Sequence, residues 1–185
     1  MKTNLRIGIN SWIIQDGNYG DFSVGDESTF ALEFYGESFS HSEQRNVELE
    51  LIKNSIYRIC GRVIYSRPNV WVIDVGIKAF CDCAPPAFLS VGDWVEGDIF
   101  LGIDPFSYRE YLYKDEGIPD LAYSWTIKRI ERNDTPWLEE SNAQGGKILA
   151  RDDRQERWLD TNATNAWDDD DGRADYVLHV DQCLP

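Results

Sequence analysis

The chain has 185 residues, of which 42% are hydrophobic and 13% aromatic, so it can bury a substantial core in one domain or in one domain with an appendage. Its net charge is −15, from 18 Lys and Arg against 33 Asp and Glu. This balance argues against phosphate backbones and anionic membrane surfaces as partners, because both are bound through basic side chains. It favours plain solubility, or else a basic protein or Ca²⁺ as the attractive partner.

The beginning of the sequence lacks the pattern of a secretory signal, since the apolar stretch at residues 5–10 is short and interrupted by polar residues. No apolar run approaches the roughly 20 residues that a membrane-spanning helix needs. We therefore expect a cytoplasmic protein with no membrane association. Its four cysteines are then expected to be reduced, as cytosolic thiols are. They are Cys60, Cys81, Cys83 and Cys183.

The N-terminal third alternates apolar and polar residues with the period of two that is typical of strands. Strands are predicted at residues 5–14, 30–34 and 47–52. The tetrapeptide Ser-Val-Gly-Asp occurs at residues 23–26 and again at 90–93, each time just before a strand. It predicts a tight turn at the glycine, followed by an aspartate that bonds to the backbone two residues on.

The central stretch, residues 57–101, reads as three or more consecutive strands. In residues 57–66 one face is apolar and the other carries Arg58, Arg62 and Ser66, as in a half-buried strand. Residues 70–75 are apolar on both faces apart from Asp74, which predicts a central strand covered on two sides. Val95, Ile99 and Leu101 then share one face of a further strand.

This order of strands resembles an OB-type barrel. The first strand would be 56–65, the second 70–75 and the third 77–81; residues 91–95 would lead into the fourth, and 123–130 would close the barrel. The resemblance covers roughly residues 55–130 and rests on the pattern of strands. It predicts a mainly β fold with an OB-like small β-barrel core at about 55–130, extended by N-terminal strands and an acidic, irregular C-terminal region.

The composition changes near residue 131. Residues 1–130 hold 19 acidic and 12 basic residues, whereas residues 131–185 hold 14 and 6, so more than half of the excess charge lies in the last third. We expect a β-rich domain at 1–130 and an acidic extension at 131–185 packed on it as one structural unit. Pro136 predicts a short helix at its start, and alternation at residues 174–180 predicts a final strand.

The most unusual string is Trp167 followed by four aspartates and Gly172. It does not fit an EF-hand loop, which needs Glu at the twelfth position. Three interpretations stay open: a looser Ca²⁺ or Mg²⁺ site, a solvated loop, or an interaction surface. As an interaction surface, the run would imitate the charge of a nucleic-acid backbone and enter a basic groove. The predicted partner-binding residues are Asp152, Asp153, Trp158, Trp167, Asp168, Asp169, Asp170, Asp171 and Asp175.

An alternative surface lies on the predicted barrel, since OB barrels bind single-stranded nucleic acid through basic, aromatic-lined faces. The charge of the whole chain argues against this use. The residues that would form such a face are Arg58, Arg62, Tyr65, Arg67 and Trp71.

Motifs for metal binding and catalysis are missing from the sequence. Cys81 and Cys83 lack the usual spacing of zinc ligands, so we expect ordinary buried or edge cysteines and no metal or cofactor. His41 and His179 are the only histidines, and pairs such as Glu48 and Glu50 occur in any acidic protein. No catalytic residue is predicted.

The sequence thus favours a non-enzymatic cytosolic binding protein that neutralises a basic partner. A bacterial toxin-immunity protein, or another inhibitor of a nucleic-acid-acting enzyme, would fit this description. Charge would speed the encounter and the tryptophans would hold the complex. The alternatives are an OB-type module for single-stranded nucleic acid and a hydrolase whose metal site is built from carboxylates.

Overall fold

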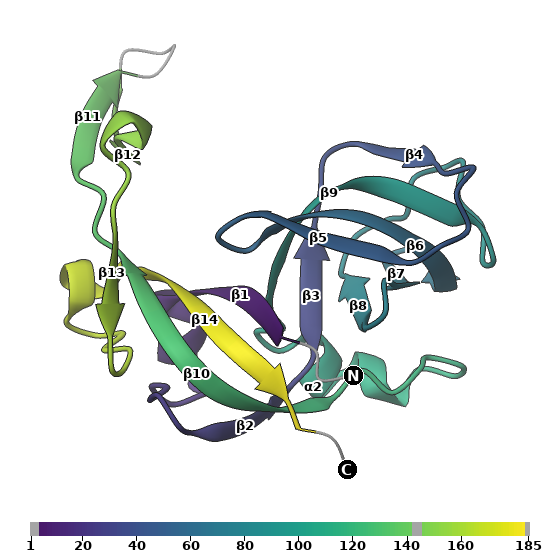
Figure 1. Cartoon of the computed structure of the whole chain (residues 1–185), viewed down its shortest axis with the longest axis horizontal. Coiled ribbons are helices and arrows are strands. Elements are labelled where there is room, and N and C mark those ends of the chain that lie inside the picture. Colours follow the sequence, from purple (N-terminus) through teal and green to yellow (C-terminus); the bar gives the residue numbers. More distant parts are fainter. Residues whose placement is uncertain (1–3, 142–145, 184–185) are drawn as a thin grey trace.

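The computed structural model describes residues 4–141 and 146–183 and confirms a mainly β chain built around a small β-barrel. Within these residues most strands join one sheet of twelve strands, which forms the barrel and then continues into a second, open part. Figure 1 shows the barrel on the right, the open part below and to the left, and a separate hairpin rising at the left edge. No helix in the described part of the chain is long and apolar enough to cross a membrane.

Five strands close the barrel in the order β6-β7-β8-β3-β9, and β9 pairs back with β6. All neighbours are antiparallel except β3 and β8, which run parallel at Glu33 and Phe80. The strands predicted at 56–65, 70–75 and 77–81 are confirmed as three of the five. The barrel strands are β3 (Leu32–Tyr35), β6 (Ile56–Arg67), β7 (Val70–Asp74), β8 (Lys78–Cys81) and β9 (Trp94–Ile103).

The strand that closes the barrel is not the one expected from the sequence. Residues 123–130 lie in β10 (Tyr123–Asn133), which pairs with strands outside the barrel. Its place is taken by β3, whose Leu32 and Phe34 are fully buried. The alternation of apolar and polar residues identified both segments as strands, but it carries no information on which strands they pair with. The closing strand therefore precedes the other four in the chain.

The open part, called the second sheet below, has the order β13-β10-β14-β1, and β2 pairs with the first half of β10. The final strand predicted at residues 174–180 is confirmed as β14, and it lies between β1 and β10. The first strand ends earlier than expected, because residues 11–15 turn into the helix α1 (Ser11–Gln15). The new strands are β1 (Asn4–Asn10), β2 (Glu27–Phe30), β13 (Trp158–Thr161) and β14 (Asp175–Gln182).

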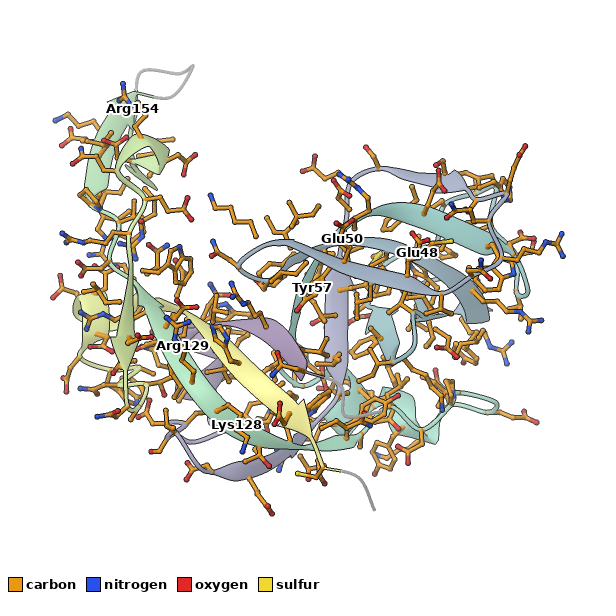
Figure 2. The ribbon with its side chains drawn as sticks, in the orientation of Figure 1. Glu48, Glu50, Tyr57, Lys128, Arg129 and Arg154 are labelled. Carbon is orange, nitrogen blue, oxygen red and sulfur yellow. A yellow bond between two sulfur atoms is a disulfide. The ribbon has the colours of Figure 1, made fainter. Side chains whose placement is uncertain are left out.

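Several contacts join the second sheet to the barrel. The Lys78 amide of β8 donates a hydrogen bond to the Tyr123 hydroxyl of β10 at 3.1 Å. β1 runs parallel to β9 with Gly8 opposite Gly102, and the Phe100 ring lies over both glycines. A side chain at Gly8 would collide with that ring. The Tyr57 hydroxyl, which lies between the two parts in Figure 2, bonds to the backbone of Arg6.

The remaining short elements cover the barrel and extend the second sheet. β4 pairs with β9 and β5 pairs with β6, so both flank the β6–β9 pair on the outside of the barrel. Between β9 and β10 the chain forms one helical turn, α2. These elements are β4 (Phe39–His41), β5 (Glu48–Lys53), α2 (Ser107–Glu110), and the 3-10 helices η1 (Leu112–Lys114), η2 (Asp153–Gln155) and η3 (Asp169–Gly172).

The separate hairpin consists of β11 (Trp137–Ser141) and β12 (Lys147–Arg151). The prediction of a short helix after Pro136 is wrong, because residues 137–141 form a strand that pairs with β12. In Figure 1 this hairpin projects away from the rest of the molecule. The contacts that attach the hairpin to the rest of the molecule are therefore expected at its base.

The repeated Ser-Val-Gly-Asp sequence makes the same turn twice. Gly25 and Gly92 have φ angles of 98° and 102°, which only glycine adopts freely. In each turn the aspartate carboxylate accepts a hydrogen bond from the serine amide three residues earlier, at 2.9 Å for Asp26 and 2.8 Å for Asp93. The turn was predicted correctly, but its carboxylate reaches back along the chain rather than forward.

The expectation of four reduced cysteines is wrong for two of them, because Cys81 and Cys83 form a disulfide. An extended chain would hold the two side chains apart. Here β8 ends at Cys81, and the chain turns so that the two Cα atoms are 5.3 Å apart, within the range that a disulfide spans. Cys60 and Cys183 remain free thiols.

Candidate functional site

The predicted acidic run folds into η3, which lies against the second sheet and the base of the hairpin. Asp170 and Asp171 have φ angles of 52° and 54°, a left-handed conformation that aspartate tolerates better than most residues. Because the backbone turns so tightly, the four carboxylates point in different directions and meet different partners. The run is therefore not one continuous charged surface.

Asp169 anchors η3 to the second sheet. Its Oδ1 accepts a hydrogen bond from Arg132 Nη1 at 2.6 Å, and its Oδ2 accepts one from the Tyr176 hydroxyl at 2.8 Å. Burial, together with the bond to Asp169, raises the pKa of Tyr176, so this phenol stays protonated and keeps donating. The charge of Asp169 is thus neutralised within the molecule.

Asp170 anchors the hairpin. Its carboxylate accepts a hydrogen bond from Trp137 Nε1 at 2.9 Å and one from Arg151 Nη2 at 2.6 Å. The Arg151 guanidinium also stacks on the Trp137 ring, 3.8 Å from its centre. One carboxylate therefore joins the first residue of β11 to the last residue of β12.

Other predicted partner-binding residues are also engaged. Asp152 is buried and caps η2, where it accepts bonds from the Arg154 amide and the Gln155 side chain. Asp175 accepts a hydrogen bond from Asn10, and Trp158 donates one to Glu156. These side chains hold the C-terminal third in place.

The acidic side chains left free for a partner form a smaller set. Asp153, Asp168 and Asp171 are exposed, and the only ion pair among them within the described residues joins Asp171 to Arg173 at 3.5 Å. Trp167 is 67% exposed, which is unusual for so large an apolar side chain. The structure thus divides the predicted surface into structural anchors and a few accessible groups, which are Trp167, Asp168 and Asp171 at η3 and Asp153 in η2.

The alternative nucleic-acid face is not assembled at the surface. Trp71 is fully buried in the barrel core and Tyr65 is buried in a second apolar cluster, so neither ring is open for stacking. Arg58 is paired with Asp98 at 3.1 Å, and Arg67 donates to Tyr65 and to the Glu116 carbonyl. Arg62 is exposed on the same strand, and its partner on β9 is the half-buried Trp94, which was not among the predicted residues.

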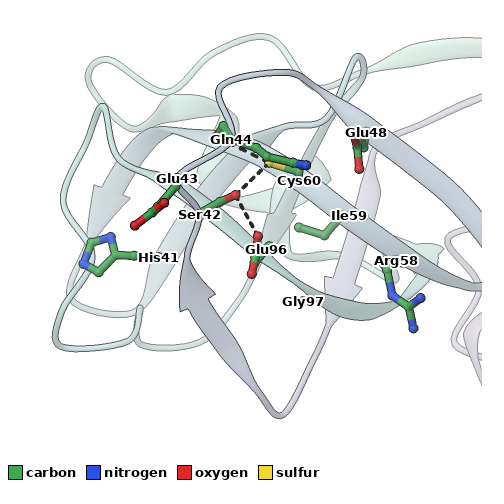
Figure 3. Close-up of a pocket in the computed structure, with 10 residues that line it drawn as sticks. All are labelled: His41, Ser42, Glu43, Gln44, Glu48, Arg58, Ile59, Cys60, Glu96 and Gly97. Atoms are coloured by element: carbon green, nitrogen blue, oxygen red, sulfur yellow. Dashed lines mark hydrogen bonds between the residues drawn. The ribbon is translucent and has the colours of Figure 1, made fainter.

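A different feature, which sequence reasoning missed, lies on the outside of the barrel. It is a cavity of about 530 Å³ between the β4–β5 loop and the outer surface of β5, β6 and β9 (Figure 3). We call it the acidic groove. It is lined by His41, Ser42, Glu43, Gln44, Glu48, Arg58, Ile59, Cys60, Glu96 and Gly97.

Strand pairing explains why acidic residues from distant segments meet there. Glu48 on β5 is opposite Cys60 on β6, Cys60 is opposite Glu96 on β9, and Glu96 is opposite Ser40 on β4. Residues directly paired in antiparallel strands point to the same face of the sheet. One row across four strands therefore places a carboxylate on each side of the Cys60 thiol.

The loop above the groove is held by a short chain of hydrogen bonds, drawn in Figure 3. The buried Cys60 thiol lies 3.4 Å from Ser42 Oγ and 3.8 Å from the Gln44 carbonyl. The Ser42 hydroxyl donates to Glu96 Oε2 at 2.7 Å. These contacts fix the Glu96 carboxylate in the wall of the groove, with its charge uncompensated.

The electrostatics of the groove are one-sided. Among the described residues Glu43, Glu48 and Glu96 form no ion pair. The lining holds one arginine and no lysine; this residue, Arg58, is engaged by Asp98, which raises the pKa of its guanidinium. A concave surface lined by one sign of charge concentrates the field inside it, so a cationic group would be attracted there.

Within the part of the chain that the structure describes, no group of three or more His, Cys, Asp and Glu side chains is arranged to hold a metal ion. The acidic run is therefore not such a set, and neither are the groove carboxylates.

Comparison of the chain with protein-family models, with curated proteins and with solved structures found no match. One signal of the groove was visible in the sequence: Glu48 and Glu50 alternate along a strand and project from β5, as Figure 2 shows. Of the two, only Glu48 lines the groove, and its meeting with Glu43 and Glu96 depends on strand order, which alternation does not reveal.

Proposed function

We propose that this protein is a non-enzymatic, cytoplasmic binding protein that neutralises a basic partner protein by receiving a basic segment in the acidic groove. The observation that carries the proposal is the groove itself, in which three carboxylates without ion pairs line one cavity of about 530 Å³. An arginine or lysine entering it would gain charge-assisted hydrogen bonds to these carboxylates, of which Glu96 is already held in place by the Ser42 hydroxyl.

The net charge of −15 would act before contact, because like-signed charge over a surface steers an oppositely charged partner toward it. The accessible carboxylates Asp153, Asp168 and Asp171 add to this steering. Trp167, with its ring largely exposed, offers an aromatic anchor of the kind that dominates many interfaces. The groove supplies the specific contact and the region around Trp167 a second one.

A natural target for such a surface is an enzyme that acts on nucleic acid, since its substrate cleft is basic. An immunity protein against a nucleic-acid-acting toxin would bind that cleft and block entry of the substrate. This role needs no catalysis by the inhibitor, only charge complementarity and a stable scaffold.

The test is binding of a fluorescent, arginine-rich peptide followed by anisotropy at low salt. We expect Glu43→Gln, Glu48→Gln and Glu96→Gln together to weaken binding by about tenfold or more, because they remove the charge inside the groove. The matched control removes three exposed carboxylates elsewhere: Glu27→Gln, Asp115→Asn and Glu116→Gln. Equal losses for both triple variants would contradict the proposal, because binding would then reflect net charge alone.

The contribution of the region around Trp167 is measured separately. Asp168→Asn with Asp171→Asn removes accessible charge and leaves the anchors Asp169 and Asp170 intact. We expect a lower association rate with the same peptide at low salt and little change in 0.5 M salt. An unchanged association rate at low salt would remove this region from the binding surface.

A further inference from the structure

The Cys81–Cys83 disulfide presents two very different sulfur atoms. Cys81 ends β8, is 3% exposed and lies in the barrel core opposite Trp71. Cys83 is exposed, at the start of the segment that leads to β9. A thiol in solution can therefore reach one side of the bond and not the other.

The surroundings of the exposed sulfur are acidic. Asp82, between the two cysteines, is exposed and accepts a hydrogen bond from Ser107 Oγ at 2.6 Å. Behind it lie two buried carboxyls, Glu33 and Asp104. The Glu33 carboxyl is hydrogen-bonded to the backbone of Asp82 and to the Tyr35 side chain. Three carboxyl groups from three segments thus lie close to this disulfide.

Two basic residues lie near this cluster in sequence, Lys78 and Arg109, and neither pairs with it. The Lys78 ammonium donates to the Asp120 carbonyl at 3.4 Å. Asp104 accepts hydrogen bonds from the backbone amides of Phe106 and Arg109, both at 3.1 Å. The Arg109 guanidinium instead donates to the Asn18 carbonyl and lies over the Tyr19 ring. Burial is the main cause that raises the pKa of Glu33, to about 7, and the charges of Asp104 and Asp82 add to it.

We propose that the Cys81–Cys83 disulfide is a thiol-exchange site, at which small neutral or cationic thiols attack Cys83 Sγ. Exposed disulfides are the labile ones, and the reactive species is the thiolate. An anionic thiol would be repelled by Asp82 and the carboxyls behind it. The site is separate from the acidic groove and does not depend on the proposed function.

The exchange takes two steps. A thiolate RS⁻ forms a bond to Cys83 Sγ, the S–S bond breaks, and its electron pair leaves on Cys81 Sγ, which takes up a proton. A second RS⁻ then attacks the R sulfur of the mixed disulfide and releases the Cys83 thiolate, which is protonated in turn. Two RSH are oxidised to RSSR and the protein disulfide is reduced to two thiols, so atoms and electrons balance.

The charge preference gives a sharp test on the full chain. Reduction is followed with cysteamine, which is cationic, and with 3-mercaptopropionate, which is anionic. Timed quenching with N-ethylmaleimide and peptide mass mapping report Cys81 and Cys83 directly, with Cys60 and Cys183 as internal references. Each rate is divided by the rate of the same reagent with 2-hydroxyethyl disulfide, which removes differences in thiolate fraction between the reagents.

We expect the normalised rate to be about tenfold higher for cysteamine at low ionic strength, and the ratio to approach one in 1 M salt. Asp82→Asn should lower the ratio. Asp153→Asn, an equal charge change in η2, should leave it unchanged. Equal normalised rates at low salt would overturn the charge preference. Alkylation of both cysteines before any reductant is added, or reduction only in denaturant, would overturn the exchange site.

The attacked sulfur is identified by exposing the native disulfide to a short pulse of cysteamine and mapping the mixed disulfide. We expect it on Cys83. A second readout uses the reaction of cystamine with the one thiol that each single variant keeps. We expect Cys83 in the Cys81→Ser variant to react about tenfold faster than Cys81 in the Cys83→Ser variant. Circular dichroism checks that each variant is folded. A mixed disulfide found mainly on Cys81 would overturn the assignment, whether or not the variants fold.

Discussion

The Tyr57 hydroxyl accepts a hydrogen bond from the Arg6 amide at 2.7 Å and donates one to the Arg6 carbonyl at 3.2 Å. A side chain of the barrel thus satisfies both backbone groups of one residue in β1. Tyr57 is buried, and burial raises the pKa of its phenol. The two parts of the fold are therefore joined by hydrogen bonds as well as by apolar contact.

Tyr57→Phe should lower the free energy of unfolding by about 1–3 kcal/mol, because the Arg6 amide and carbonyl lose their partner while they remain partly buried. Urea unfolding followed by circular dichroism measures this. Tyr113→Phe is the control, since Tyr113 is half exposed on η1 and should change stability by less than about 0.5 kcal/mol. Equal effects in the two variants would show that the hydroxyl of Tyr57 does not stabilise the contact.

Glu33 should make the protein less stable as the pH rises from about 5 to 7. Its pKa is raised from 4.5 to about 7 in the folded chain, so between these values the folded state holds a proton that the unfolded state has lost. The contribution of this group to the unfolding free energy is complete below pH 4.5. It falls by about 3 kcal/mol in total as the pH rises from 4.5 through 7. Glu33→Gln should flatten the profile of unfolding free energy against pH, measured in urea. The exposed control Glu27→Gln should keep the wild-type slope, and parallel profiles for all three proteins would contradict the prediction.

Asp170→Asn should weaken the attachment of the β11–β12 hairpin. Asparagine tolerates the left-handed backbone at this position, so the substitution tests the carboxylate and not the conformation. Trp137 and Arg151 each lose an anionic acceptor, and Arg151 is nearly buried, so we expect a loss of about 1–3 kcal/mol in urea unfolding. The carboxylate of Asp168, within the described part of the chain, accepts a side-chain hydrogen bond from Asn165 alone, so Asp168→Asn should cost well under 1 kcal/mol. A larger loss for Asp168→Asn would contradict the assignment.

Gly61→Ala should destabilise the barrel. A Cβ at this position would lie 2.5 Å from Val75 Cγ1 and 2.8 Å from the Asp74 carbonyl oxygen, and the backbone cannot yield as a flexible side chain would. We expect a loss of about 2 kcal/mol or more, seen as a lower Tm. Gly20→Ala meets no atom within 4 Å and should leave Tm unchanged or slightly higher. A neutral Gly61→Ala would show that β6 and β7 pack less closely than described here.

The sequence predicted most strands because burial on one face forces alternation, and this pattern is local. Tyr57, Ile59 and Val63 point into the core as expected. Pairing is not local, which is why β3 rather than residues 123–130 closes the barrel. The helix expected after Pro136 failed for the same reason: residues 137–141 are a strand only because β12 lies beside them.

The candidate site was harder to predict than the fold. Charge counting located acidic residues but not their partners, so Asp169 and Asp170 looked accessible although Arg132 and Arg151 engage them. The acidic groove requires the register of four strands, and no run of sequence contains it. Trp71 lay in the strand expected to be covered on two sides, and its burial follows from that same pattern.

The order in which the strands emerge during synthesis sets a constraint on this chain. β1 is made first, yet its partner β14 begins 165 residues later, at Asp175 opposite Asn10. At about 5–20 residues per second a ribosome needs roughly 10 to 30 seconds to make the intervening chain. For that time the apolar strand β1 lacks β14, the strand with which it shares its long antiparallel pairing, so the yield in a cell would depend on chaperones that shield β1 until translation has passed β14.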